Sequence, residues 1–194
     1  GVASDITEKR LAEKQIYDLA HYDALTGVPK REMLLDALET AVSGPANGAS
    51  RFAIHALDVD RFKTINDVYG HSAGDTFLRE TAERLRELMG PNDVVARFGG
   101  DEFVVLQMDI TGRDEAMALA VKIQQSLSEP VHIDGASAQS SVSLGIAMCP
   151  EHSESPAELL KFADLALLAS KAAGRDTTCF FESDLNDDIS ERIA

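Results

Sequence analysis

The sequence predicts an α/β fold of the α+β kind, in which helices flank a central, mostly antiparallel five-stranded sheet. Three observations lead to this prediction. Residues 52–56 are apolar at nearly every position, which is typical of a strand buried on both faces. Two valine-rich runs flank Gly99 and Gly100, as in a β-hairpin whose tight turn needs positive φ. Segments with helical apolar spacing separate these strands, so their order indicates an α/β sandwich.

The N-terminal segment predicts a helix over residues 5–20, with Asp5 as its N-cap and Glu8 completing a capping box. This helix carries a narrow apolar seam with coiled-coil spacing, formed by Ala12, Ile16 and Leu19. The seam is short, so two alternatives remain open: it contacts a second copy, or it docks on the domain that follows.

The next predicted elements surround the first strand. A helix is expected over residues 30–42, and a loop rich in Gly, Pro, Asn and Ser over residues 43–50. The first strand ends at Asp58, and a short helix covers residues 62–69. We expect Asp60 to be the N-cap of that helix.

Two longer helices are predicted from apolar residues that recur at helical spacing. The first covers residues 73–89 and ends at Gly90-Pro91. Its apolar stripe is Leu78, Ala82, Leu85 and Met89. The second covers residues 113–128. Its apolar stripe is Ala116, Ala120, Ile123 and Leu127.

The C-terminal third predicts a strand, a helix and a last strand. The first strand is long and covers residues 138–148. Ser155-Pro156-Ala157-Glu158 is a capping box with proline in the first turn, and it opens a helix that ends near Gly174. The last strand covers residues 177–181.

Two acidic clusters point to chemistry. Asp58 closes a central strand, where α/β sheets tend to bind ligands, and Asp60 points to the same side. Asp101 and Glu102 stand at the tip of the hairpin. Crowded carboxylates repel one another unless a cation lies beside them, and hard oxygen ligands suit magnesium. The sequence therefore predicts a two-metal site, at which Lys63 could meet a phosphate.

The composition is that of one enzyme domain. The net charge of −15 argues against DNA or RNA as a partner, because phosphate backbones demand basic surfaces. No apolar run reaches the ~20 residues of a membrane span, so we expect no membrane contact by this segment. Cys149 and Cys179 lack metal-ligand spacing and are expected to be reduced thiols of a cytoplasmic protein. The chain begins with Gly1 and is interpreted as a piece of a longer protein.

Several motifs, in order and spacing, resemble the GGDEF domains, which are the diguanylate cyclases of bacterial signalling. They are Asp23-Ala24-Leu25-Thr26-Gly27, Asp58-Val59-Asp60-Arg61-Phe62-Lys63, Asn66-Asp67, Gly70-His71, Gly74-Asp75, Gly99-Gly100-Asp101-Glu102-Phe103, Ser141-Val142-Ser143-Leu144-Gly145-Ile146-Ala147 and Lys171-Ala172-Ala173-Gly174-Arg175. The resemblance implies a fold related to nucleotidyl cyclases and polymerase palm domains. It divides the chain into a linker helix (1–21), the GGDEF domain (22–182) and a tail (183–194).

The resemblance also implies a metal site. Asp58, the backbone carbonyl of Val59, and Asp101 would hold Mg²⁺ or Mn²⁺, with Glu102 close by. Asp101 would also help to take the proton from the attacking 3′-hydroxyl.

The same resemblance implies the contacts to GTP. Asn66 and Asp75 would recognise guanine, because an amide and a carboxylate complement its polar edge and not that of adenine. Backbone N–H groups near Phe62 and three basic side chains would grip the β- and γ-phosphates. These basic residues are Lys63, Lys171 and Arg175. The last two could alternatively be an ordinary basic end of a helix.

The implied reaction condenses two GTP molecules into cyclic di-GMP with loss of two pyrophosphates. Each copy would hold one GTP, so a second copy must pair with the first, stably or transiently. The resemblance also implies an upstream PAS-like sensor and a possible downstream EAL phosphodiesterase domain. One alternative is a catalytically silent, GTP-binding and dimerising module that regulates such an EAL domain. A cyclase that makes a mononucleotide product fits the guanine-reading pair less well.

Four residues depart from the family pattern. Lys30 replaces the usual Asn, Leu168 replaces a Tyr, and Ser170 replaces an Ala. Gly90 stands where many members carry the Arg of an inhibitory Arg-x-x-Asp product site, while Asp93 keeps the Asp position. We therefore expect weak feedback inhibition by the product.

Overall fold

The computed structural model describes residues 2–44 and 51–183. Most of the loop predicted over residues 43–50, and all but the first residue of the tail predicted over 183–194, therefore lie outside the described residues. Within the two described segments, no helix combines the length and the apolar character needed to cross a bilayer.

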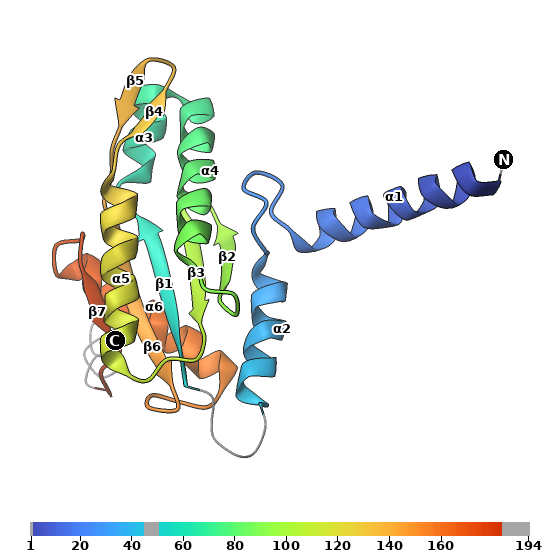
Figure 1. The fold of residues 1–194 in the computed structure, drawn as a ribbon. Coiled ribbons are helices and arrows are strands. Elements are labelled where there is room, and N and C mark those ends of the chain that lie inside the picture. The colour runs from blue at the N-terminus through green and yellow to red at the C-terminus, as the bar shows by residue number, and fades with distance from the viewer. Residues whose placement is uncertain (1, 45–50, 184–194) are drawn as a thin grey trace, which may run out of the picture.

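The core of the fold is a five-stranded sheet in the order β2-β3-β1-β6-β7 (Figure 1). The middle strand, β1 (Phe52–Val59), runs antiparallel to both β3 (Glu102–Gln107) and β6 (Val142–Cys149). At one edge, β2 (Val94–Gly99) forms the predicted antiparallel hairpin with β3. At the other edge, β7 (Thr178–Phe180) runs parallel to β6. The mostly antiparallel five-stranded sheet predicted from the sequence is confirmed.

Helices cover both faces of the sheet. α2 (Arg31–Val42) and α6 (Pro156–Ala172) share one buried apolar cluster with it. α4 (His71–Leu88) and α5 (Arg113–Ser128) share the other cluster. The short α3 (Phe62–Tyr69) follows β1 directly and packs against α4. Because both faces are covered, β1 is buried along nearly its whole length, as the apolar run predicted.

The predicted helices form within a few residues of their expected bounds, and the apolar stripes of α4 and α5 face the core. Ser155 caps α6 by accepting a hydrogen bond from the N–H of Glu158, as predicted. The return bond of the predicted capping box does not form, because the N–H of Ser155 donates to the hydroxyl of Ser153. The prediction for Asp60 was wrong: Arg61, with φ 53°, is the N-cap of α3. Asp60 is buried, and its carboxylate accepts hydrogen bonds from the hydroxyls of Ser141 and Ser143 at the start of β6.

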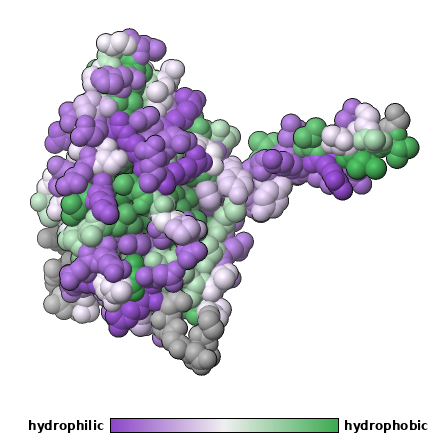
Figure 2. Space-filling view, viewed as in Figure 1, coloured by the Kyte–Doolittle hydropathy of each residue, from purple (hydrophilic) through white to green (hydrophobic). Residues whose placement is uncertain are grey.

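The N-terminal helix α1 (Val2–His21) projects away from the sheet (Figure 1). It begins before Asp5, so the predicted N-cap was wrong. Asp5 lies instead in the first turn, where an acidic side chain also favours a helix. No residue of α1 is buried, and both apolar and polar residues line its surface (Figure 2). In this structure the apolar seam therefore does not dock on the domain, which was one of the two alternatives.

The strand predicted over residues 138–148 forms as β6 (Val142–Cys149), so only its start was predicted too early. The residues before it form a separate hairpin of β4 (Val131–Ile133) and β5 (Ala136–Ala138). Asp134 and Gly135 make its turn with φ values of 47° and 82°. An Asp-Gly pair is a strong hairpin signal that the sequence interpretation overlooked.

Candidate active site

The end of β1 lies beside the turn of the β2–β3 hairpin. Asp58 is paired in register with Glu102, and the N–H of Val59 donates to the carbonyl of Asp101 at 3.4 Å. The side chains of Asp58 and Asp101 line the same cleft and are close enough for Asp58 to raise the pKa of Asp101. The two acidic clusters that the sequence predicted as a site therefore meet at the C-terminal end of the middle strand β1.

Arg97 stabilises the hairpin turn through hydrogen bonds to its backbone. Gly99 and Gly100 adopt φ values of 140° and 51°, a backbone conformation that is strained for any residue with a side chain. The guanidinium of Arg97 donates to the carbonyl of Gly100 through Nε at 2.9 Å and Nη2 at 2.6 Å. The same guanidinium pairs with Asp23 at 2.9 Å, so the turn is tied to the loop that follows α1.

The Asp23 loop is itself a closed turn. The N–H and the hydroxyl of Thr26 donate to the Asp23 carboxylate at 2.9 and 2.7 Å. Burial would raise the pKa of Asp23, but the hydrogen bonds from Thr26 and Arg97 outweigh it and lower that pKa below its usual value. No role was predicted for this motif from the sequence. The Asp-x-x-Thr spacing signals a turn, whereas the distant Arg97 partner cannot be read from the sequence.

The acidic pair has the character of a cation site. Burial raises the pKa of Asp101 to about 6, and the hydrogen bond and negative charge of Asp58 act in the same direction. Lys171 Nζ lies 2.6 Å from the Asp58 carboxylate and partly offsets this charge. Two crowded carboxylates beside the backbone of Val59 form a set of oxygen donors that suits Mg²⁺ or Mn²⁺.

A cleft of about 350 Å³ opens at this point. It gathers every predicted site residue except Asp75 and Glu102, together with Asp60 and Arg61. Its lining residues are Asp58, Val59, Asp60, Arg61, Phe62, Lys63, Asn66, Asp101, Lys171 and Arg175. They come from the end of β1, the first turns of α3, the hairpin turn and the end of α6.

Two predicted residues stand apart from this cleft. Glu102 is exposed, and its charge helps to raise the pKa of Asp164 on α6, after the larger effect of burial. The part of the chain that the structure describes holds no group of three or more acidic, His or Cys side chains placed to bind a metal. Asp75 is exposed near the start of α4, one residue after Gly74, whose backbone lies against the Asn66 side chain.

Asp60 joins three segments around the cleft. Its carboxylate accepts hydrogen bonds from the hydroxyls of Ser141 and Ser143, each at 2.7 Å, and from the N–H of Asp176 at 3.1 Å. Arg175, which lines the cleft, directly precedes Asp176 and has a φ of 68°. The buried carboxylate therefore fixes the loop that carries a predicted phosphate ligand.

Three of the departures from the family pattern have local explanations. Lys30 donates from Nζ to the carbonyl of Leu19 at 2.7 Å and so binds the end of α1 to the start of α2. Ser170 is fully buried, but its hydroxyl is satisfied by the carbonyl of Leu167 at 2.8 Å. Leu168 is 52% exposed. None of the three lines the cleft.

The retained Asp93 has a structural explanation as well. One carboxylate oxygen accepts from the N–H of Gly90 and the other from the N–H of Met108, both at 2.8 Å. Asp93 therefore closes the turn before β2 and anchors the far end of β3. The weak product feedback expected from Gly90 stays a prediction.

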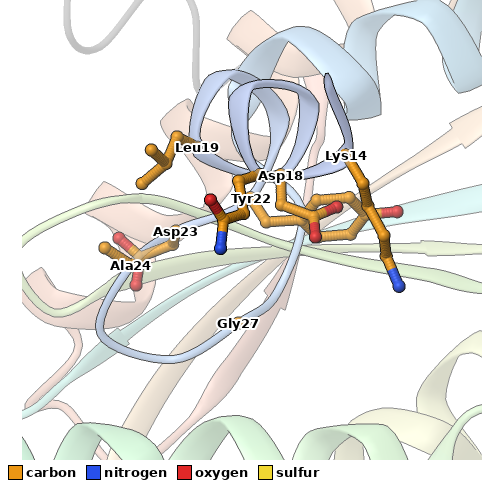
Figure 3. Close-up of a pocket in the computed structure, with 8 residues that line it drawn as sticks. Lys14, Asp18, Leu19, Tyr22, Asp23, Ala24 and Gly27 are labelled. Atoms are coloured by element: carbon orange, nitrogen blue, oxygen red, sulfur yellow. The ribbon is translucent and has the colours of Figure 1, made fainter. Parts of the chain in front are cut away.

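A larger cleft of about 740 Å³ lies away from the acidic pair, between the end of α1 and the loop that follows it (Figure 3). Lys14, Asp18 and Leu19 of α1 and Asp23 and Gly27 of the loop line it. It contains none of the predicted site residues.

A family model described as "Diguanylate cyclase, GGDEF domain" matches residues 20–177. The chain belongs to the GGDEF family. A solved structure that comprises only the GGDEF domain of TpbB from Pseudomonas aeruginosa matches with a TM-score of 0.85 at 36% identity. The match covers 88% of this chain and 99% of that one, so the GGDEF fold is shared nearly in full.

The curated relatives of this GGDEF chain are longer proteins. It is 40% identical over 184 residues to the bifunctional diguanylate cyclase/cyclic di-GMP phosphodiesterase MucR of P. aeruginosa. The matched region covers 94% of this chain and 26% of MucR. It is 38% identical over 174 residues to the cyclic di-GMP phosphodiesterase NbdA of the same organism. This match covers 90% of this chain and 22% of NbdA. The chain thus spans about a quarter of the length of these relatives.

Proposed function

We propose that this chain is an active diguanylate cyclase, which condenses two GTP molecules into cyclic di-GMP. The observation that carries the proposal is that Asp58 and Asp101 line one cleft together with Lys171 and Arg175. Such a cleft offers oxygen donors to a cation and positive charge to a triphosphate.

The proposed reaction consists of two identical phosphoryl transfers. In each, the 3′-oxygen of one GTP attacks the α-phosphorus of the other, and the bond to pyrophosphate breaks. Asp101 accepts the proton of the 3′-hydroxyl, because it lies at the hairpin tip that faces the cleft. Mg²⁺ or Mn²⁺ held by Asp58, Asp101 and the Val59 carbonyl would lower the pKa of that hydroxyl and offset the triphosphate charge.

The other residues bind and orient the nucleotide. Asn66 and Asp75 recognise guanine; Asp75 directly follows Gly74, and the Asn66 side chain lies against the backbone of Gly74. Backbone N–H groups near Phe62 and basic side chains hold the β- and γ-phosphates. These side chains are Lys63, Lys171 and Arg175.

Pairing of two copies completes the site in this proposal, because one domain presents a single triphosphate cleft. The exposed apolar seam of α1 supports such pairing, since it is free of the domain. Residues 1–21 then act as the linker helix of a GGDEF domain over 22–182. An upstream PAS-like sensor and a downstream EAL domain after residue 183 would belong to the same proposal.

The test is turnover. The chain is incubated with GTP and MgCl₂ at several protein concentrations, and the nucleotides are separated by chromatography. Cyclic di-GMP should rise more than linearly with protein concentration, because two loaded copies must meet. Asp101→Asn keeps the shape of the side chain but removes its charge, and should reduce turnover by a factor of about 10³ or more. Turnover that persists in this variant would contradict the assignment of Asp101.

The second candidate is a silent module that binds GTP and regulates a neighbouring EAL domain. The similarity to a segment of NbdA, named as a phosphodiesterase, favours it. Calorimetry separates the two candidates. GTP binding without any product would support the silent module, whereas product that depends on Asp101 supports the cyclase.

A further inference from the structure

The side chain of Asn66 rests on the backbone of Gly74, where α3 and α4 lie side by side (Figure 1). A Cβ atom placed on Gly74 would overlap Oδ1 of Asn66 and would approach its Cγ to 2.9 Å. The same atom would lie 3.2 Å from Cζ of Phe62. The Asn66 carboxamide therefore occupies the space that any side chain at position 74 would need.

The backbone gives no other reason for a glycine here. Gly74 is buried inside α4, and its φ lies outside the left-handed region that requires glycine elsewhere in the chain. Glycine within a helix is intrinsically unfavourable compared with alanine. What position 74 requires is the absence of a side chain.

The neighbours of Gly74 hold α3 and α4 together. Ile65 and Ala73 are buried between the two helices, so their backbones cannot separate without opening the core. The ring of Phe62 packs against that of Phe77 at 6.5 Å between centroids. An alanine at position 74 would therefore displace the Asn66 carboxamide from its rotamer and leave the helices in place.

We infer that Gly74 is a positioning residue for base recognition, which acts by fixing the direction of the Asn66 carboxamide beside Asp75. The inference rests on the proposed function, in which this pair recognises guanine. Recognition of a base edge depends on where the donor and the acceptor point, so a displaced amide loses guanine selectively.

A double-mutant cycle tests the inference. Dissociation constants for GTP and ATP, with Mg²⁺ present, are measured by calorimetry for the wild type, Gly74→Ala, Asn66→Ala and the double variant. Gly74→Ala should weaken GTP binding roughly tenfold and leave ATP binding unchanged, so that discrimination between the bases falls. In the Asn66→Ala background, Gly74→Ala should change GTP binding by less than about twofold, because the colliding carboxamide is gone.

Gly112→Ala is the matched control. Gly112 precedes α5, and an added Cβ would meet nothing within 4 Å. This variant should bind GTP like the wild type. Melting temperatures of all variants without nucleotide separate a loss of binding from a loss of folding.

Two results would overturn the inference. The first is wild-type discrimination between GTP and ATP in Gly74→Ala. The second is an equal loss from Gly74→Ala with and without Asn66, which would make Gly74 a packing residue of the helix pair.

A wild type that binds no GTP would instead refute the proposed function and, with it, the role in base recognition. The displacement itself is tested without nucleotide. The side-chain amide resonance of Asn66, assigned by its disappearance in Asn66→Ala, should shift in Gly74→Ala. An unchanged resonance would contradict the steric argument.

Discussion

His55 is a titratable side chain placed inside the central strand. It is fully buried, and its Nε2 is hydrogen-bonded to Gln107 at 2.9 Å. Burial lowers the pKa of His55 to about 4, although Gln107 and the charge of Asp93 oppose that shift. The folded protein therefore holds this imidazole neutral under conditions where an exposed histidine would be charged.

This burial predicts a pH dependence of stability. In the unfolded chain the pKa of histidine is about 6.5, so the unfolded state binds the proton more readily than the folded state. Stability from His55 is complete above that value and is lost as pH falls toward 4. About 2 kcal/mol of the free energy of unfolding should disappear between pH 7 and pH 5.

Urea denaturation of the wild type and of His55→Gln at both pH values measures this loss. The variant should be less sensitive to pH by about that amount, since its side chain does not titrate. Equal pH dependence in the two proteins would show that His55 is not the group responsible.

For single residues, the sequence predicted which side chains line the cleft better than it predicted their individual contacts. Asp58, Lys63 and Lys171 line the cleft as expected, because each belongs to a local motif whose place in the fold follows from one strand or one helix end. Asp60 was misassigned because its partners, among them Ser141 and Asp176, lie far from it in the sequence. A contact between distant segments leaves no periodicity in the sequence.

Among the elements, the β2–β3 hairpin depends on a contact outside itself. Arg97 connects the Gly100 carbonyl to the Asp23 carboxylate, and its side chain is only 11% exposed. Removal of such a partner leaves a half-buried carboxylate unpaired, which costs more than the loss of an exposed ion pair.

Arg97→Ala should lower the free energy of unfolding by about 2 kcal/mol. It should also reduce cyclic di-GMP formation on the order of tenfold, because the turn that carries Asp101 loses its anchor. Lys9→Ala serves as the control, since the Lys9–Glu13 pair is exposed and its loss should cost at most about 1 kcal/mol. Full activity of Arg97→Ala, measured at saturating GTP, would show that the hairpin holds its shape unaided.

Helices and hairpins with strong local signals were predictable, including the Ser155 N-cap of α6 and the hairpin at Gly99. The β4–β5 hairpin was missed because its strands are only three residues each, too short for alternation to be visible. β7 runs parallel to β6 because α6 connects the two strands as a crossover. That the two strands are neighbours in the sheet is seen only in the folded structure.

For the whole molecule, the free helix α1 predicts how activity depends on concentration. Ile16 is 69% exposed and Leu19 67% exposed, so their apolar surface is available to a second copy. Ile16→Glu should place a charge in that contact, reduce dimerisation and lower activity at low protein concentration.

Sedimentation and turnover, each over a range of protein concentrations, measure this effect. Activity should recover toward the wild-type value at high concentration, because the cleft that holds Asp58 and Asp101 is untouched. Thr7→Glu, nine residues earlier on the opposite side of α1, adds the same charge and should leave pairing intact. If both variants behave like the wild type, the seam is not a pairing surface.

The hydrogen bonds of the Asp60 carboxylate have a consequence for how the protein folds. They unite the end of the first strand, the start of β6 and a loop near residue 176, so the chain must close very long loops before the cleft exists. Closing such loops is entropically expensive and tends to come late in folding. A chain still emerging from the ribosome would lack the cleft until its last strand had been made. Nucleotide could then stabilise only molecules that have finished folding, and not their partly folded precursors.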